Sequence, residues 1–341
     1  MKILVTGGTG YIGAHTVVEL MQSGFDVDVI DNFNNSKPEV IDAIEQIVKK
    51  RPAFFQIDLT NAAATEHYFK THKPDATVHF AAHKAVGLSV EQPLEFYRNN
   101  LLSLINVLQS GLNHNVYHFV FSSSCSVYAD PDKLPIDENA PVKKAKSPYG
   151  NTKKTGEEII EDTVAATKLN AISLRYFNPV GSHDSALIGE LPTNMPLNVM
   201  PIITKVAIGK QEVFTVFGND YPTPDGSCIR DYIHVTDVAQ AHVTAVKRLL
   251  NKGNKNRYEV FNLGTGKGSS VFELINAFEK VTGLKLNYKV VKRREGDAVA
   301  VYADTTLANT ELKWKAQRDL DNMIKTAWNW ELHLAGRNDF V

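Results

Sequence analysis

The sequence predicts an α/β protein: a Rossmann-type, doubly wound parallel sheet with a smaller, mixed α/β C-terminal lobe. Short apolar runs alternate through the first half with segments long enough for helical crossovers. A glycine-rich turn follows the first of these runs. From about Asn178 the alternation stops and prolines and glycines accumulate, so a second unit is expected there. The length of 341 residues agrees with two units, because single domains are usually shorter.

Six runs in the first half have the composition of buried strands. They are KILVTG, FDVDVIDNF, PAFFQIDL, ATVHFAA, VYHFVFSSS and LNAISLRYF. Continuous apolar stretches such as HFVF (residues 118–121) indicate burial on both faces, as in a parallel sheet covered by helices. A helical pattern over residues 234–250 and a strand in YEVFNLGTG predict that the chain returns to the sheet. The expected division is therefore interleaved, with residues 1–177 and 234–262 in one unit and residues 178–233 and 263–341 in the other.

Composition excludes several classes of protein. Hydrophobic residues make up 43% and charged residues 22%, as in ordinary globular proteins. A net charge of −1 provides no long-range field for nucleic acid or an anionic membrane, so neither is expected as a partner. The start MKILVTGG reaches glycines too soon for a signal peptide or a membrane span.

The cysteines and histidines indicate the compartment and the absence of a metal. Cys125 and Cys228 are far apart and have neither metal-ligand spacing nor a disulfide framework, which favours a reducing compartment and hence the cytoplasm. The histidines do not cluster with carboxylates as metal ligands do, so no metal is expected. Those considered are His79, His83, His118 and His234.

The glycine-rich turn has the features of a dinucleotide site. Gly7, Gly10 and Gly13 have GxxGxxG spacing between a strand and an amphipathic helix, where a pyrophosphate can approach the helix amino terminus. Asp31 follows Gly13 by eighteen residues, at the end of the second strand. Its carboxylate can accept hydrogen bonds from both adenosine ribose hydroxyls, which favours NAD over NADP. A tight strand-to-helix turn with a surface aspartate is the plainer interpretation of the glycines alone.

Two other strand ends are expected beside this turn. Asp58 follows the third strand and could bind the adenine amino group, while FAAHK (residues 80–84) ends the fourth. The carboxyl edge of such a sheet is where its ligands bind.

SPYGNTKKTGEEI (residues 147–159) predicts a helix that carries a tyrosine and a lysine on one face. Ser147 suits the N-cap and Pro148 the first helical position. Tyr149 and Lys153 then lie one turn apart. A free phenol has a pKa of about 10 and needs cationic help to act as a base at neutral pH. Lys153, the helix amino terminus and an oxidised nicotinamide could each supply that help.

Ser124 completes this arrangement. It follows HFVFSS at the end of a strand and can relay a proton or donate a hydrogen bond to a reacting oxygen. Together with a dinucleotide site, the three side chains suit oxidation of an alcohol. Alone, a YxxxK pair is more often an ordinary helix face and SSS an ordinary strand end.

The motifs TGGTGYIG, SSSCSVY and YGNTK resemble the extended short-chain dehydrogenase/reductase family. The segments RYFNPVG, NVMPII, FGNDYPTPDGSCIRDYIHV, NLGTG and RREGD are similar to its UDP-hexose 4-epimerase branch, in order and along nearly the whole chain. The resemblance implies a tightly held NAD, epimerisation at C4 of UDP-hexoses such as UDP-galactose and UDP-glucose, and a homodimer. It also implies that the first unit binds NAD and the second binds the UDP-sugar.

The resemblance implies the chemical roles as well. Tyr149 would remove the proton of the 4-hydroxyl while the C4 hydride passes to the nicotinamide. The 4-keto sugar would then turn over and take the hydride back on its other face. Ser124 would relay or orient the proton, and Lys153 would bind the nicotinamide ribose and lower the tyrosine pKa.

The implied binding residues extend over the chain. Those expected to contact NAD are Gly7, Gly10, Tyr11, Ile12, Gly13, Asp31, Asn32, Asn35, Ser36, Asp58, Leu59, Phe80, Ala81, Ala82, Lys84, Asn99, Ser122, Tyr149, Lys153 and Phe177. Those expected to contact the UDP-sugar are Lys84, Ser124, Tyr149, Asn178, Asn198, Val199, Thr215, Phe217, Arg230, Tyr232, Arg294, Asp297 and Val301. Among these, Arg230 and Arg294 would contact the pyrophosphate, because guanidinium groups suit phosphate oxygens.

Some positions depart from the usual pattern of the branch. Cys125 and Ser126 follow Ser124, Ala129 replaces a usual glycine, and Leu88 stands where glutamate is frequent. Val301 occupies a position where some members carry a bulky tyrosine and others a small residue. A valine leaves space, so N-acetylated UDP-hexoses are expected as additional substrates.

Two alternatives stay open from the sequence. A sugar-nucleotide 4,6-dehydratase shares the cofactor and the first oxidation but needs an extra acid and base, and Ser124-Cys125-Ser126 has no carboxylate. A catalytically silent NAD-sensing protein would use the same fold, but such proteins typically lack the tyrosine and lysine pair.

Overall fold

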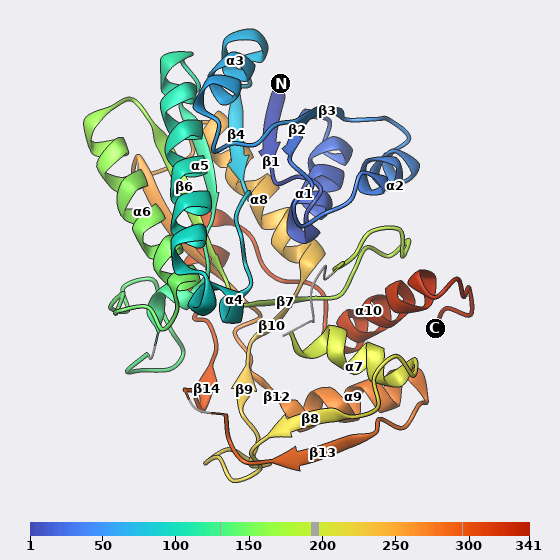
Figure 1. Cartoon of the computed structure of the whole chain (residues 1–341). Helices are drawn as coiled ribbons and strands as arrows, with labels where there is room; N and C mark the ends of the chain where they lie inside the picture. The colour runs from blue at the N-terminus through green and yellow to red at the C-terminus, as the bar shows by residue number, and fades with distance from the viewer. Residues whose placement is uncertain (130, 192–197, 295) are drawn as a thin grey trace.

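The computed structural model describes residues 1–129, 131–191, 198–294 and 296–341 (Figure 1). A seven-stranded sheet contains β1 (Lys2–Thr6), β2 (Asp26–Asp31), β3 (Ala53–Gln56), β4 (Ala76–His79), β5 (His118–Ser122), β6 (Asn170–Tyr176) and β11 (Tyr258–Leu263). Its order is β11-β6-β5-β4-β1-β2-β3, and every neighbouring pair is parallel. The predicted doubly wound sheet is therefore confirmed, including the late return of the chain in β11.

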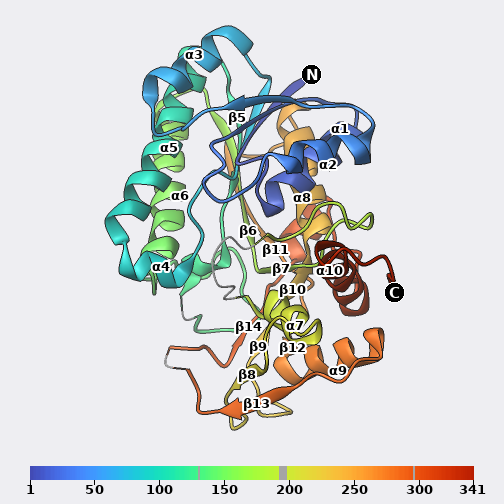
Figure 2. The ribbon, with the colours of Figure 1, turned by 45° about the vertical axis from the view of Figure 1, so that its right-hand side comes forward.

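Helices cover both faces of this sheet (Figure 2). One layer contains α1 (Tyr11–Gln22), α2 (Glu39–Val48) and α8 (Val235–Leu250), and the other contains α3 (Ala62–His72), α5 (Pro93–Asn113) and α6 (Pro148–Ala166). Along β1, Ile3 and Val5 pack into the first layer and Leu4 into the second. Burial on both faces explains why the strands are apolar without alternation.

The second lobe lies beyond the carboxyl edge of the large sheet (Figure 1). Its helices are α7 (Val199–Ala207), α9 (Val271–Thr282) and α10 (Leu320–Leu334). Its strand pairs are β7 (Asn178–Val180) with β10 (Tyr232–His234), and β8 (Phe214–Phe217) with β13 (Tyr288–Val291). A further sheet has β9 (Ile229–Arg230) between β12 (Ser269–Ser270) and β14 (Ala300–Val301). The lobe has its own apolar core, in which the rings of Phe278 and Trp328 meet edge to face at 5.7 Å.

The chain passes between the two units several times. After β6 it enters the lobe at β7, and after β10 it begins α8 directly, with the His234 side chain capping that helix. Within residues 263–341, the short helix η2 (Ala308–Leu312) and Trp314 pack into the apolar cluster around α8 and β11. The Trp314 indole donates a hydrogen bond to the Asp237 carbonyl over 3.1 Å. No helix in the described ranges is both long enough and apolar enough to cross a membrane.

Candidate active site

A cleft that is partly open to solvent lies at the carboxyl edge of the parallel sheet. The glycine turn forms its floor at the switch point between β1 and β4, the usual ligand position in such sheets. Every residue expected to bind the dinucleotide lines the cleft except Phe177. Phe177 is buried instead in a separate apolar cluster with Val127, Tyr128, Ile136 and Ala303.

The glycine turn leaves room where a pyrophosphate would approach. A Cβ on Gly13 would lie 2.2 Å from the Gly7 carbonyl oxygen, and a Cβ on Gly7 would lie 2.7 Å from the Ala81 nitrogen. Gly10 is the N-cap of α1 and has no side chain to satisfy the first N–H groups of the helix. These groups point a partial positive charge into the cleft, so the turn fits an anionic phosphate.

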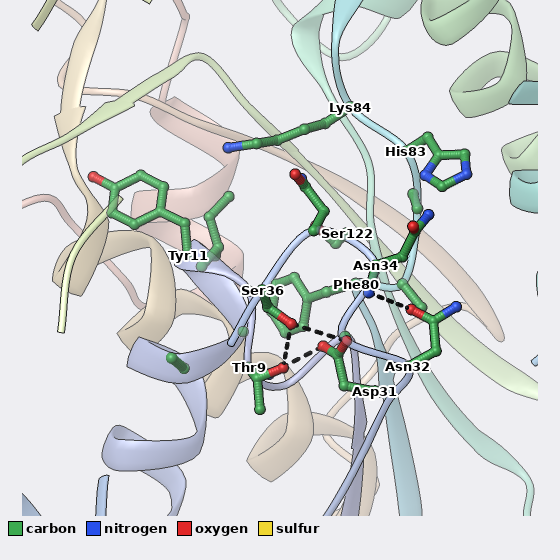
Figure 3. A pocket seen from close by; sticks show the side chains of 18 of the residues that line it. Thr9, Tyr11, Asp31, Asn32, Asn34, Ser36, Phe80, His83, Lys84 and Ser122 are labelled. Carbon is green, nitrogen blue, oxygen red and sulfur yellow. Dashed lines mark hydrogen bonds between the residues drawn. The ribbon is translucent and has the colours of Figure 1, made fainter. Parts of the chain in front are cut away.

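Asp31 is fixed at the end of β2 by groups around the glycine turn. Its carboxylate accepts hydrogen bonds from the backbone N–H of Thr9 at 3.3 Å and of Phe33 at 2.9 Å, and from the Ser36 hydroxyl at 3.1 Å. The hydroxyls of Thr9 and Ser36 are 2.7 Å apart (Figure 3). The carboxylate is thereby held at the cleft wall, where it can accept from ribose hydroxyls.

Lys84 reaches across the cleft from the loop that follows β4 toward Tyr11 (Figure 3). Its ammonium lies 5.7 Å from the Tyr11 ring centroid and 2.9 Å from Glu190. Glu190 also accepts a hydrogen bond from the Asn198 amide at 2.9 Å. One carboxylate therefore links a residue of the dinucleotide cleft to a residue expected to contact the UDP-sugar.

The first turns of α6 place Tyr149 and Lys153 in the cleft. Ser147 caps the helix by accepting a hydrogen bond from the Gly150 N–H at 3.1 Å, and Pro148 is the first helical residue, as predicted. Tyr149 and Lys153 are 8% and 4% exposed, and both line the cleft. The Lys153 ammonium donates to the Ser122 carbonyl at 2.7 Å and lies 4.9 Å from the Phe121 ring centroid.

Burial sets the charge of both groups. It raises the pKa of Tyr149 well above its ordinary value, while a hydrogen bond with Ser124 acts in the opposite direction. Burial lowers the pKa of Lys153 to about 8, and the charge of Glu157 opposes this shift. At neutral pH the pair is a phenol and an ammonium group, so added positive charge in the cleft would favour the phenolate.

Several residues expected to hold the UDP-sugar form one cluster in the second lobe. Asp297 accepts hydrogen bonds from Arg294 at 2.8 Å and from Arg230 at 3.5 Å. The Arg294 guanidinium lies 5.5 Å from the Phe217 ring centroid, and Val301 on β14 pairs with Arg230 on β9. The cluster provides two cations and an aromatic face, as a nucleotide diphosphate requires.

Other residues expected at this site lie elsewhere in the lobe. The Asn178 amide nitrogen, on β7, is buried and makes no hydrogen bond with the described residues. Tyr232 is buried in the lobe core, Val199 packs against that core, and Thr215 lies on β8. Within RREGD, Glu295 lies outside the described residues, as do Pro192 and Pro196 of the proline-rich stretch.

The sequence did not reveal part of the cleft wall. Leu187, Ile188, Gly189 and Leu191 line it together with Trp330 of α10, far along the chain. A Cβ on Gly189 would lie 2.5 Å from the Trp330 ring, and the indole donates to the Glu190 carbonyl at 2.9 Å. No local motif marks this contact. The cleft residues Thr9, His83 and Tyr176 were not among those expected to contact NAD, although Thr9 falls inside the glycine motif and His83 inside FAAHK.

Comparisons with known proteins also indicate a protein that uses a dinucleotide. The model of the NAD dependent epimerase/dehydratase family matches residues 3–264. A UDP-glucose 4-epimerase of Mus musculus is 47% identical over 337 residues, which cover 97% of this chain and 96% of that protein.

Two solved structures are also similar over nearly their whole length. The UDP-glucose-4-epimerase of Stenotrophomonas maltophila, with bound NAD and formylated UDP-arabinopyranose, has a TM-score of 0.95 and 44% identity, covering 98% of this chain and 99% of that one. The UDP-glucose 4-epimerase of Bifidobacterium longum, in complex with NAD+ and UDP, has a TM-score of 0.92 and 43% identity, covering 98% of each chain.

The glycine turn predicts the effect of adding one methyl group. Gly13→Ala places a Cβ on the Gly7 carbonyl, and overpacking of this kind costs about 1–3 kcal/mol. We expect NAD affinity to fall by about tenfold or more, measured as NAD retained by the purified protein and by calorimetric titration.

Gly253→Ala is the matched control, because its nearest neighbour would be a backbone oxygen at an ordinary 3.5 Å. It should retain NAD as the unaltered protein does. Unchanged NAD retention by Gly13→Ala would contradict the placement of the dinucleotide on this turn.

Proposed function

The chain belongs to the NAD dependent epimerase/dehydratase family, and on that premise we propose that it epimerises UDP-hexoses at C4, interconverting UDP-galactose and UDP-glucose. It is an enzyme and uses NAD as its cofactor. The observation that carries the proposal is the buried Tyr149 and Lys153 pair in the dinucleotide cleft. An alcohol held there meets a proton-accepting group and a hydride acceptor in one place.

The cleft residues divide the binding of NAD among them. The N–H groups at the start of α1 hold the pyrophosphate, and Asp31 accepts from the adenosine ribose. Lys153 binds the nicotinamide ribose. When bound, NAD supplies the acceptor and later the donor of the C4 hydride, and its oxidised ring adds positive charge to the cleft.

Tyr149 moves the proton of the sugar 4-hydroxyl. The positive charges around it favour its phenolate, while burial keeps the phenol protonated without them. Ser124, hydrogen-bonded to Tyr149, relays or orients that proton. The hydroxyl loses its proton to Tyr149 as C4 becomes a ketone, and the same proton returns to the oxygen when the opposite alcohol forms.

Inversion needs a firm hold on the nucleotide and a loose hold on the sugar. Arg230 and Arg294 bind the diphosphate, Phe217 packs against the uridine, and Asp297 accepts from its ribose. We assign the Asn178 amide, whose nitrogen has no partner among the described residues, as a further donor to the substrate. With the nucleotide anchored by charge, the 4-keto sugar can turn and present its other face.

The other candidates are less well supported. A 4,6-dehydratase needs a further acid and base beside Ser124, where this chain has Cys125 and Ser126. Burial raises the pKa of the Cys125 thiol to about 12, so it does not serve as an acid-base group at neutral pH. A silent NAD sensor has no use for Tyr149 and Lys153 side by side in the dinucleotide cleft, whereas groups with shifted pKa values in a cleft are typical of reaction sites.

Incubation with UDP-galactose and NAD-loaded protein tests the function. We expect UDP-glucose in the NMR spectrum, whereas a 4-keto-6-deoxy sugar would indicate a dehydratase and unchanged substrate would indicate a sensor. Tyr149→Phe removes the proton-transfer group and should lower kcat by about 100-fold or more, with NAD still bound.

Tyr97→Phe controls for the loss of a hydroxyl. Tyr97 is on α5, and its hydroxyl accepts a hydrogen bond from Asn151 at 2.9 Å. This variant should epimerise at close to the normal rate. Normal turnover by Tyr149→Phe would refute its assignment as the base.

We also propose that the enzyme accepts N-acetylated UDP-hexoses. Val301 is half-buried beside Cys125 and Phe177, on the strand that pairs with Arg230. Its side chain is much smaller than a tyrosine, so a sugar bound against it would have more room for an acetamido group.

Val301→Tyr should lower kcat/KM for UDP-N-acetylglucosamine by about tenfold or more, with a smaller effect on UDP-galactose. Val299→Tyr is the control, because Val299 is 38% exposed just before the same strand. Coupled assays with both substrates measure the ratio. A wild-type protein that epimerises UDP-galactose but never UDP-N-acetylglucosamine would contradict this proposal.

The two-unit division supports these assignments. We propose that residues 1–177 and 234–262 bind NAD and that residues 178–233 and 263–341 bind the UDP-sugar. Separate apolar cores support this division, although residues 308–314 of the second range pack with the first core. We also propose a cytoplasmic location, which the two unpaired cysteines support.

We propose that the chain forms a homodimer through α4 (Val86–Glu91) and α5. Exposed apolar side chains gather on these helices, namely Val86, Val90, Leu94, Leu102 and Ile105. Leu94 is 80% exposed, and Leu94, Leu102 and Ile105 lie on one side of α5. A contiguous apolar surface of this kind is typical of subunit contacts.

Leu102→Glu should therefore convert the dimer to a monomer, because a charge at an apolar contact loses its hydration. Light scattering after size-exclusion chromatography measures the mass. Leu284→Glu places the same charge on an equally exposed leucine, 40% against 39%, in the second lobe and should leave the dimer intact. A monomeric wild type, or a dimer that survives Leu102→Glu, would contradict this interface.

A further inference from the structure

A buried ion pair lies directly behind the catalytic serine run. Glu157 of α6 accepts hydrogen bonds from Arg175 of β6, with Nε to Oε1 at 2.9 Å and Nη2 to Oε2 at 2.6 Å. The two side chains are only 8% and 7% exposed. The proposed function assigns neither of them a role, although α6 and β6 both carry residues of the cleft.

Glu157 also holds the strand end that contacts both Tyr149 and Lys153. The Ser123 hydroxyl donates to Glu157 Oε1 at 2.5 Å. On one side of Ser123, the Ser122 carbonyl accepts from the Lys153 ammonium. On the other side, Ser124 is hydrogen-bonded to Tyr149. Glu157 therefore fixes the middle residue of a segment whose two neighbours each contact a group of the proposed reaction.

The far side of the ion pair is also anchored. Arg175 Nη1 donates to the Tyr128 hydroxyl at 2.8 Å, and that hydroxyl donates to Asn262 Oδ1 at 2.7 Å. The Asn262 N–H in turn donates to Glu138 at 2.7 Å. Because these residues come from β6, β11 and the short helix η1 (Cys125–Tyr128), Glu157 has little freedom to move.

Glu157 is one helical turn beyond Lys153, so its charge acts on the ammonium group. Burial lowers the pKa of Lys153, and Glu157 raises it. The other titratable groups near Lys153 are Tyr149 on α6, Tyr176 on β6, His79 on β4 and His242 on α8. Burial lowers the pKa of His79 to about 3 and that of His242 to about 4, so both are neutral at neutral pH.

Glu157 itself is surrounded by groups from several elements. They are Arg175 from β6, Ser123 after β5, Tyr258 from β11 and Lys153 from its own helix. Replacing the carboxylate by an amide would leave Arg175 and Lys153 as two buried cations without a compensating anion. The loss of the Glu157 charge and the uncompensated charge of Arg175 both lower the pKa of Lys153, so its ammonium form loses the proton at a lower pH.

We propose that Glu157 is a positioning residue for the epimerisation: it fixes the Ser122 to Ser124 segment and supplies the negative charge that keeps Lys153 cationic beside Tyr149. The inference rests on the proposed function, because it assigns Glu157 to the reaction that Tyr149 and Lys153 carry out. An ion pair that served the fold alone would not influence the pH dependence of turnover.

The test compares Glu157→Gln with Glu158→Gln, its neighbour on α6. Glu158 is 57% exposed and pairs with Lys154 at 3.8 Å, so it is a matched loss of one carboxylate. The measurement is kcat and kcat/KM for UDP-galactose between pH 6 and about 10. In Glu157→Gln the alkaline limb should move to lower pH by about 1 unit, whereas the Glu158→Gln profile should superimpose on that of the wild type.

Ser123→Ala separates the charge from the hydrogen bond. It leaves the Glu157 carboxylate in place and removes the side-chain bond that joins the serine segment to it, so kcat should fall while the alkaline limb stays where it is. This variant also decides the matter if Glu157→Gln does not fold or retain NAD. In that case a normal kcat in Ser123→Ala would overturn the positioning role.

The outcomes distinguish a failure of the role proposed for Glu157 from a failure of the proposed epimerase function. An active wild type with an unshifted profile in Glu157→Gln overturns the role of Glu157 and leaves the epimerase function intact. A wild type that does not convert UDP-galactose overturns the proposed function and this inference with it. The large loss of kcat in Tyr149→Phe is expected whether or not Glu157 has this role, so that variant tests the proposed function alone.

Discussion

The packing of α6 against the end of β5 is the contact on which the rest of the site depends. Gly156 allows it: a Cβ there would lie 2.9 Å from the Phe121 ring. The close approach places the Lys153 ammonium over that ring and against the Ser122 carbonyl. Since Tyr149 is one turn earlier on the same helix, this contact also fixes where the phenol stands. A helix held farther away would leave both side chains without their partners.

Burying two polar groups beside each other is costly, and the surrounding network offsets that cost. Lys153 keeps its charge because it donates to a carbonyl and has Glu157 below it. Tyr149 instead is left as a protonated phenol that a cation can convert to phenolate. Tyr149 can therefore change its charge when a cation is near, whereas the surrounding groups keep the charge of Lys153 constant. Such an asymmetry suits a proton that must be taken and then returned.

Local sequence patterns predicted most of the first unit, but they predicted little of the cleft wall that the later part of the chain forms. Apolar strands predicted the parallel sheet because both faces are buried, and the glycine spacing with Asp31 located the cleft. Phe177 follows β6 in sequence, but its side chain points into another apolar cluster. The contact between Gly189 and Trp330 could not be predicted, because it joins segments with no shared periodicity.

Local sequence patterns also do not reveal backbone strain or ion pairs between distant segments. Ala129 adopts φ 54° and ψ −106°, a left-handed conformation that favours glycine and costs a residue with a Cβ about 1–3 kcal/mol. Glu157 and Arg175 are eighteen residues apart on a helix and a strand, so only the assembled fold brings them together.

The ion pair of Arg294 with Asp297 and that of Glu157 with Arg175 differ in exposure, and the difference matches their proposed roles in binding and in catalysis. Arg294 is 58% exposed where it meets Asp297, so its guanidinium stays partly hydrated and can exchange that carboxylate for a phosphate without being left as a buried, unpaired charge. The buried Glu157 and Arg175 pair cannot exchange partners in this way, because separating it would leave charges without hydration. In the proposed assignment, the arginines of the second lobe can therefore exchange partners with a nucleotide while Tyr149, Lys153 and Ser124 keep their positions. An enzyme whose substrate must turn within the site needs this combination of replaceable contacts at the nucleotide and fixed contacts at the reacting carbon.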